Sequence, residues 1–287
     1  MNAFSRSLQL TKLTFEVINK DRELLGFAGL SLLSSTVFFL AMLFPSVISQ
    51  IVADGFEFES FHAFQFVMIG LTYFGLAFIT TFFNVCVVYT TKMRFEGGAP
   101  TFKGSLDFAL SRIGIIAKWS LVSASVGVLL RILQNLASRL GKVGELFANI
   151  LISMIGMAWG IVTIFVVPVL VFEGLGPMQA LSKSTEVIKK TWGENLVKSF
   201  GLGLIHLLAA IAILSVSLGL MSLLNAVYEP AGSWIGAGIA VLFLGITELI
   251  FGVANSVFNT ALYIYAQNGQ LAPGFSSELV QSVFKQK

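Results

Sequence analysis

Residues 147–172 read FANILISMIGMAWGIVTIFVVPVLVF, with no Asp, Glu, Lys or Arg among them. As an α-helix, which rises 1.5 Å per residue, this stretch is about 39 Å long. The hydrocarbon core of a bilayer is about 30 Å thick, and about 20 mainly apolar residues cross it. A lipid-facing β-strand would instead alternate apolar and polar residues. The stretch therefore predicts a transmembrane helix.

Five more stretches of this kind lie on either side of it. The weakest covers residues 113–133, because Lys118 and Arg131 leave only a short apolar run between them. Of the 287 residues, 56% are hydrophobic and 11% are charged, whereas a soluble domain averages about 25% charged residues. This composition excludes an ordinary soluble enzyme, a disordered protein and a secreted disulfide scaffold. We predict an all-α polytopic membrane protein, a single integral membrane domain over residues 1–287 with spans at residues 24–48, 64–89, 113–133, 147–172, 196–224 and 234–263.

The basic residues indicate how the spans are oriented. All but three of the 18 Lys and Arg residues lie before the first span, in or beside the connections after the second and fourth spans, or after the last span. The exceptions are Arg131, Arg139 and Lys142. Because Lys and Arg are enriched in cytoplasmic loops, we expect a multi-pass protein of the cell membrane with both termini in the cytoplasm. The net charge of +3 follows from this bias and does not indicate a nucleic-acid partner.

A short motif recurs in the connections on this cytoplasmic side. Phe95-Glu96-Gly97-Gly98-Ala99-Pro100 follows the second span, and Phe172-Glu173-Gly174-Leu175-Gly176-Pro177 follows the fourth. After the last span the match is looser, with Pro273-Gly274-Phe275 in place of Pro100-Thr101-Phe102. We therefore predict three parallel repeats, at about residues 1–99, 100–176 and 177–274, each an amphipathic helix followed by a two-span hairpin.

The motif has two interpretations. In the structural one, its glycine ends a helix in the left-handed conformation and its proline begins the next helix, where no N–H is needed. In the functional one, the two glutamates form a paired binding or coupling site at the cytoplasmic face. The structural interpretation is favoured. The residues concerned are Glu96, Gly97 and Pro100 in the first copy and Glu173, Gly174 and Pro177 in the second.

Four segments outside the spans have the spacing of amphipathic helices. Apolar residues share one side of the helix in residues 4–20, 102–113 and 178–192, and in a shorter C-terminal segment, 275–287. Helices of this kind lie in the membrane interface; packing beneath the spans and docking of a soluble partner are the alternatives. We also expect Trp119 and Trp192 to lie in an aromatic belt at the membrane boundary.

Three stretches give the chain a family resemblance. Lys20-Asp21-Arg22-Glu23-Leu24-Leu25 enters the first span, residues 166–174 read VVPVLVFEG, and residues 190–194 read KTWGE. With these stretches the chain resembles an uncharacterised family of six-span prokaryotic membrane proteins over essentially its whole length. The resemblance implies a fold and no functional residues. More distantly, the pattern is similar to the membrane domain of some bacterial glycerophosphodiester phosphodiesterases, although we expect no soluble catalytic domain and no such activity here.

Glu248 stands out among the polar residues of the spans. A charge near the centre of a span costs roughly 2.5–3.5 kcal/mol on insertion scales, so Glu248 should be paired, protonated or directed into the bundle. Asn255 and Asn259 follow it on the same helical face. Asn84, the counterpart of Asn259 in the repeat, is expected to join them from the second span. We predict a polar seam that runs from the middle of the membrane to the cytoplasm.

Depth along the helices suggests a partner for Glu248. At 1.5 Å per residue, Glu248 lies roughly 22 Å and Arg131 roughly 27 Å from the cytoplasmic ends of their spans. Arg131 is therefore a candidate partner, unless its long side chain reaches outward to the headgroups. His206, roughly 12 Å deep, is a poorer match unless a hydroxyl such as that of Ser215 lies between.

The seam also has two interpretations. It is either a path for transport or proton coupling, along which Glu248 and His206 titrate, or a set of hydrogen bonds between helices, each contributing about 0.6 kcal/mol. Transporters commonly have broken helices. Pro168 is expected to kink the fourth span, but the glycine-rich residues 156–160 indicate close packing. The sequence favours the second interpretation.

The remaining residues do not indicate an enzyme. The chain has two histidines, His62 and His206, and no carboxylate pair, metal-ligand spacing, nucleophile elbow or phosphate-binding loop. We predict no catalytic residues, no metal and no cofactor. The leading hypothesis is a non-enzymatic component that organises membrane lipids, a partner protein or copies of itself at the cytoplasmic face, without nucleic acid. The alternative is a small transporter or proton-coupled permease that uses Glu248.

Overall fold

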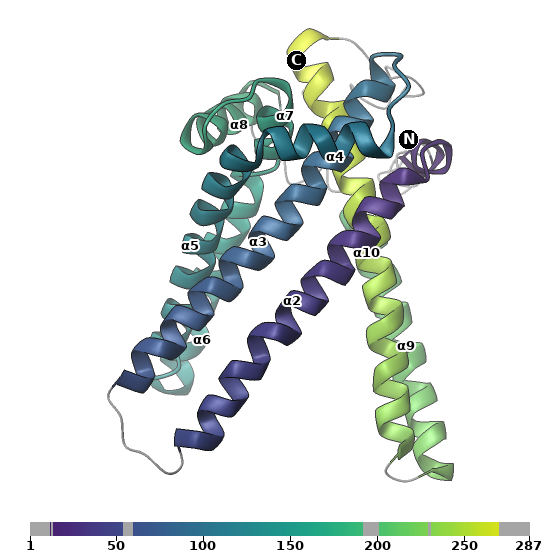
Figure 1. Cartoon of the computed structure of the whole chain (residues 1–287). Coiled ribbons are helices and arrows are strands. Elements are labelled where there is room, and N and C mark those ends of the chain that lie inside the picture. Colours follow the sequence, from purple (N-terminus) through teal and green to yellow (C-terminus); the bar gives the residue numbers. More distant parts are fainter. Residues whose placement is uncertain (1–11, 13, 54–59, 192–200, 229–230, 270–287) are drawn as a thin grey trace. The chain divides into compact units, whose positions relative to one another are not determined.

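Helices form the regular structure of the described chain. The computed structural model describes residues 12, 14–53, 60–191, 201–228 and 231–269. No strand is present in these ranges, which confirms the predicted all-α class. The helices, shown in Figure 1, are α2 (Glu23–Ala53), α3 (Ser60–Phe95), α4 (Phe102–Ser111), α5 (Ile113–Ala137), α6 (Gly141–Val162), α7 (Val166–Phe172), α8 (Pro177–Thr191), α9 (Gly201–Val227) and α10 (Ala231–Asn268).

Six helical stretches of the described residues are long and apolar enough to cross a membrane. They correspond one to one to the six predicted spans and indicate a multi-pass membrane protein. Large apolar side chains such as Phe44, Val216 and Val241 are about 70% exposed on them. A soluble monomer rarely exposes so much apolar surface, so these side chains suit contact with lipid. The six stretches are Glu23–Pro45, Phe66–Phe95, Ile113–Ala137, Gly141–Phe172, Ile205–Ala226 and Ala231–Asn268.

The chain divides into two compact units, which we describe separately. One comprises residues 1–28 and 190–287, and the other comprises residues 29–189. These boundaries differ from those of the predicted repeats. The single-domain organisation, the three repeats and the three parallel hairpins stay predictions. Residues 4–11 and 13 of the first predicted amphipathic helix, Trp192 and the whole segment 275–287 lie outside the described residues.

In the unit of residues 29–189, α3 packs against α4, α5 and α7, and α5 packs against α6. Small residues allow close approach between these helices. The ring of Phe38 in α2 lies against Gly75 of α3, where a Cβ atom would overlap it. The ring of Tyr73 in α3 lies in the same way against Gly127 of α5. In Figure 1, α4 crosses the end of α3, and α5, the next helix in the chain, runs beside α3.

Trp119 lies inside this unit. It is 5% exposed, and its ring stacks on Trp159 of α6 with centroids 5.9 Å apart. The expectation that Trp119 lies in an aromatic belt is therefore wrong. Trp119 instead packs between α5 and α6. Two stacked aromatic rings bury more apolar surface there than a single ring buries at the membrane boundary.

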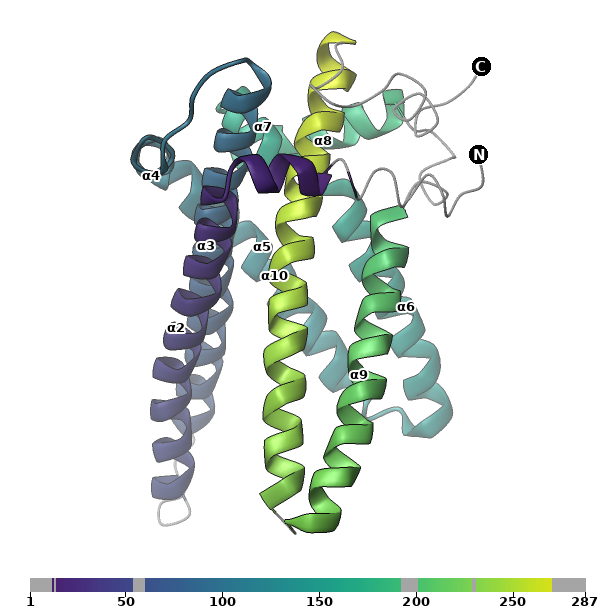
Figure 2. The ribbon, with the colours of Figure 1, turned by 90° about the vertical axis from the view of Figure 1, so that its right-hand side faces the viewer.

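In the other unit, α9 and α10 lie alongside each other in opposite directions (Figure 2). Glycines allow the helices to meet closely near their connected ends. A Cβ atom on Gly232 would overlap the backbone of Leu224, and one on Gly236 would lie 2.7 Å from Cα of Met221. Such small residues let the backbones of membrane helices approach one another. The hydroxyl of Ser233 also donates to Oδ1 of Asn225 at 2.9 Å.

The fourth span is interrupted, with α6 ending at Val162 and α7 beginning at Val166. Pro168 explains the interruption. It has no N–H to bond the carbonyl of Ile164, and in a regular helix its ring would collide with that carbonyl. The hydroxyl of Thr163 donates to the Trp159 carbonyl at 2.8 Å and so occupies an acceptor at the end of α6. The kink expected from Pro168 is therefore a break between two helices.

Candidate functional site

The first copy of the Phe-Glu-Gly motif ends α3. Gly97 has a φ of +82°, and its N–H donates to the Arg94 carbonyl at 3.1 Å. The N–H of Gly98 donates to the Met93 carbonyl at 2.8 Å. These two bonds form a Schellman motif, which satisfies carbonyls of the last helical turn. Gly97 therefore acts as a helix stop.

The next helix does not begin at Pro100. α4 begins at Phe102, and Thr101 caps it by accepting a hydrogen bond from the Gly104 N–H at 3.1 Å. A threonine hydroxyl suits this place because it satisfies one of the free N–H groups of the first turn. Pro100 lies one residue before the cap, so its expected position as the first residue of the helix is wrong.

The second copy follows α7. Gly174 has a φ of +64°, which again suits a helix end. Pro177 is the first residue of α8, as the structural interpretation predicts. The N–H of Gly176, just before it, donates to Oε1 of Gln179 at 3.3 Å. The carboxylate of Glu173 lies on an exposed residue.

The structure brings the two copies together through a lysine of α3. The ammonium of Lys92 lies 4.7 Å from the centre of the Phe172 ring and 3.9 Å from Oε1 of Glu96. A second cation, Arg112, fills the space beside Gly174, where a Cβ atom would lie 2.5 Å from its guanidinium. Each copy is thus contacted by a basic residue. A paired site of the two glutamates stays a prediction.

Two buried hydroxyls attach α4 and α8 to neighbouring segments. The hydroxyl oxygens of Thr90 in α3 and Ser105 in α4 lie 2.7 Å apart. The N–H of Phe165, in the break before α7, donates to Oγ of Ser184 in α8 at 3.1 Å. Each of these four residues is 0% exposed. A buried N–H without a partner costs about 1–3 kcal/mol, so Ser184 stabilises the break and fixes α8 to it.

Replacing Ser184 with Ala is expected to lower the free energy of unfolding by about 1–3 kcal/mol, because it removes the buried hydrogen bond from the Phe165 N–H to Oγ of Ser184. The matched control is Ser182→Ala, on an exposed position of the same helix, which should change stability by less than about 0.5 kcal/mol. Thermal unfolding of the purified protein in detergent measures both. Equal midpoints for the two variants would contradict this role of Ser184.

His206 of α9 and Glu248 of α10 lie in contact between these two helices. Nε2 of His206 is 2.9 Å from Oε1 of Glu248. The geometry at Nε2 does not meet that of a well-aligned hydrogen bond, so we describe the contact as an ion pair that forms when His206 is protonated. The His206 side chain is 24% exposed and that of Glu248 is 67% exposed.

Aromatic rings hold His206 in position. Its ring stacks on Phe251 of α10, with centroids 4.7 Å apart and planes 21° apart. Phe15, in the helical residues 14–20, packs edge-on against the same Phe251 ring, with ring centroids 6.2 Å apart. Because Phe251 is buried, the stack restrains rotation of the imidazole and keeps Nε2 beside Glu248.

The other predicted polar residues lie in both units. Asn255 and Asn259 continue the face of α10 that carries Glu248; Asn255 is exposed and Asn259 is half-buried. Asn84, half-buried in α3, and Arg131, exposed in α5, belong to the unit of residues 29–189. Their predicted links with Glu248 and Asn259 stay predictions.

The depth estimate ranked His206 too low. At 1.5 Å per residue, His206 lies about 32 Å from the end of α9 at Val227, and Glu248 lies about 26 Å from the start of α10 at Ala231. Measured from these connected ends, the two residues are close in depth. The prediction from sequence counted depth from the opposite span ends, which a sequence pattern locates only approximately. Ser215 does not bridge the pair; its hydroxyl donates to the Ile211 carbonyl.

The described ranges contain residues of the types that bind metals, and one free cysteine. No group of three or more His, Cys, Asp or Glu residues there could hold a metal ion. Cys86 is buried in α3. The predictions of no catalytic residue, no metal and no cofactor stay predictions.

Comparison with known proteins places the chain in a family. No curated protein matches it. The model of a family of unknown function, DUF6159, matches residues 63–274, a range that includes both copies of the motif and the pair of His206 and Glu248. This match confirms the prediction of an uncharacterised family of membrane proteins. The prokaryotic origin and the likeness to phosphodiesterase membrane domains stay predictions. The chain therefore belongs to the family of unknown function DUF6159.

Proposed function

We propose that this protein is a non-enzymatic membrane component that binds lipids or a partner protein at its cytoplasmic face. The observation that supports the proposal most directly is the attachment of α4 and α8 by buried hydrogen bonds, through Ser105 and Ser184. Both hydroxyls are 0% exposed. A short helix that is fixed along one side presents its opposite side in a constant direction, which suits recognition of another molecule.

The outward side of α8 is charged. Lys189 and Lys190 are exposed, and Lys183 lies 3.3 Å from Oε2 of Glu186. The pair of Lys183 and Glu186 carries no net charge, so Lys189 and Lys190 leave this side positive. Each basic residue near an anionic membrane surface contributes about 1 kcal/mol of attraction. The side therefore suits anionic headgroups or an acidic surface of a partner.

Replacing Lys183, Lys189 and Lys190 together with Glu is expected to lower at least about tenfold the amount of co-purifying lipid or protein that is bound at the outward side of α8, because this surface changes from attractive to repulsive. Mass spectrometry of protein extracted in mild detergent measures the bound material. The matched control is the double change of Arg139 and Lys142 to Glu, on exposed positions at the end predicted to lie outside. Unchanged binding in the triple variant, or an equal loss in the control, would contradict the proposal.

The contact of His206 with Glu248 supports a second candidate, a proton-linked transporter. A histidine and a carboxylate 2.9 Å apart within apolar helices can exchange a proton, and ionisable residues inside spans commonly mark such paths. Proton uptake into vesicles that contain the purified protein tests this candidate. Uptake that is lost in Glu248→Gln supports it, and uptake that survives the change contradicts it.

A further inference from the structure

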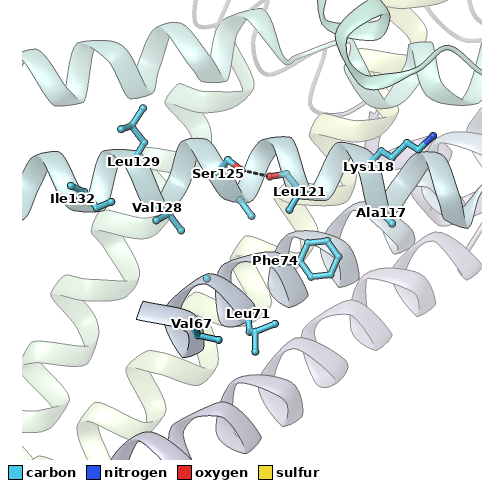
Figure 3. Close-up of a pocket in the computed structure, with 12 residues that line it drawn as sticks. Val67, Leu71, Phe74, Ala117, Lys118, Leu121, Ser125, Val128, Leu129 and Ile132 are labelled. Carbon is cyan, nitrogen blue, oxygen red and sulfur yellow. Dashed lines mark hydrogen bonds between the residues drawn. The ribbon is translucent and has the colours of Figure 1, made fainter. Parts of the chain in front are cut away.

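A groove runs between α3 and α5 in the unit of residues 29–189 (Figure 3). Its volume is about 830 Å³, within the range of about 300–1,000 Å³ that is usual for ligand sites. Leu71 and Phe74 line it from α3, and Leu121 and Val128 line it from α5. These helices are both predicted spans, so the groove opens at the depth of lipid chains.

The groove exists because small residues leave space along helices that are held together elsewhere. No heavy atom lies within 4 Å of the place where a Cβ atom of Gly70 would be. The contact between Tyr73 and Gly127 holds α3 and α5 together. The hydroxyl of Ser125 donates to the Leu121 carbonyl at 2.8 Å and is thereby satisfied within its own helix. The walls therefore suit an apolar occupant.

One end of the groove carries a positive charge. Lys118 lies about 8 Å along α5 from its start at Ile113, and Figure 3 shows its ammonium directed away from the apolar residues. No Asp or Glu lines the groove. Among the described residues Lys118 is exposed and makes no hydrogen bond or ion pair. A lysine near the end of a span extends its ammonium to the headgroup level.

We propose that this groove binds one anionic phospholipid, with its phosphate at Lys118 and an acyl chain between α3 and α5. From Lys118 to Ile132 the groove is about 21 Å long, which exceeds the roughly 15 Å that half of a hydrocarbon core occupies. The occupant must be apolar over this length and anionic at one end, and the surrounding bilayer supplies such a molecule. The site includes no residue of α8, so it does not depend on the proposed function.

Native mass spectrometry of the full-length protein tests the site after incubation with an equal mixture of phosphatidylglycerol and phosphatidylcholine. The wild-type chain is expected to retain one phosphatidylglycerol molecule. Lys118→Gln should lower the retained ratio of phosphatidylglycerol to phosphatidylcholine about fivefold, the effect of one lysine near anionic headgroups. Gly70→Leu should remove both lipids, because its side chain enters the groove.

Two controls separate this site from general effects. Lys142→Gln removes an exposed charge outside the groove, and Gly160→Leu adds a side chain at an open, exposed position of α6; both should retain the lipid. The triple lysine variant of α8 should also retain it, so failure of the proposed function and failure of this site are distinguishable. A ratio that Lys118→Gln leaves unchanged, or a lipid that persists in folded Gly70→Leu, would overturn the proposal.

Discussion

His206→Phe is expected to destabilise the protein by about 2–3 kcal/mol, whereas Glu248→Gln costs less and the double variant is close to Glu248→Gln alone. Phenylalanine keeps the stack on Phe251 but leaves Glu248 without the imidazole nitrogen that lies 2.9 Å from its carboxylate. A charged residue in the middle of a span costs roughly 2.5–3.5 kcal/mol, and glutamine avoids that charge. The two changes are therefore expected to be strongly non-additive, as is usual for residues in contact.

Thermal unfolding of the four proteins in detergent gives the coupling. Asn255→Leu is the matched control, because Asn255 lies on the same face of α10 as Glu248 and is exposed. It should show no coupling with His206→Phe. Proton uptake into vesicles, measured on the same variants, separates the two interpretations of the pair. Coupled stability without uptake indicates a bond between helices, and uptake lost in Glu248→Gln indicates transport. Additive effects of His206→Phe and Glu248→Gln would contradict the pairing itself.

The spans were predictable because their signal is local. The length of an uninterrupted apolar run such as residues 147–172 is enough to predict a segment that crosses the membrane. The left-handed Gly97 and Gly174 were predictable for the same reason, since a helix end needs a residue that tolerates positive φ. The start of the helix after Gly97 was predicted wrongly, at Pro100. Thr101 caps α4 with its hydroxyl, so the helix begins after Thr101.

Contacts between helices were not predictable from such signals. Lys92 contacts Phe172 only because α3 packs against α7. No pattern in the sequence predicts this contact. The contact of His206 with Glu248 was missed because the depths of both residues were counted from span ends that a sequence pattern locates only approximately. The break before α7 could have been found from Pro168, whose missing N–H must disturb the preceding turn. Ser184, which accepts the hydrogen bond from the Phe165 N–H at this break, lies on another helix, and no sequence pattern marks it.

Gly232→Ala, which adds a single methyl group, is expected to destabilise the protein strongly. The added Cβ atom would overlap the carbonyl carbon and oxygen of Leu224, and Gly232 is buried. Backbone atoms cannot rotate out of the way as a side chain can. α9 and α10 must therefore separate near their connected ends and lose the close approach that small residues provide. Overpacking usually costs about 1–3 kcal/mol and sometimes more, and we expect a loss above about 3 kcal/mol here.

Gly238→Ala is the control in the same helix. No heavy atom lies within 4 Å of its Cβ position, and the residue is exposed. Alanine favours a helix over glycine by up to about 1 kcal/mol, so the same substitution should stabilise α10 at this position. The yield of monodisperse protein in size-exclusion chromatography and the midpoint of thermal unfolding should fall for Gly232→Ala and stay level or rise for Gly238→Ala. Equal behaviour of the two variants would show that α9 and α10 do not meet at Gly232, because only a backbone contact there gives one added methyl group opposite effects at two positions of one helix.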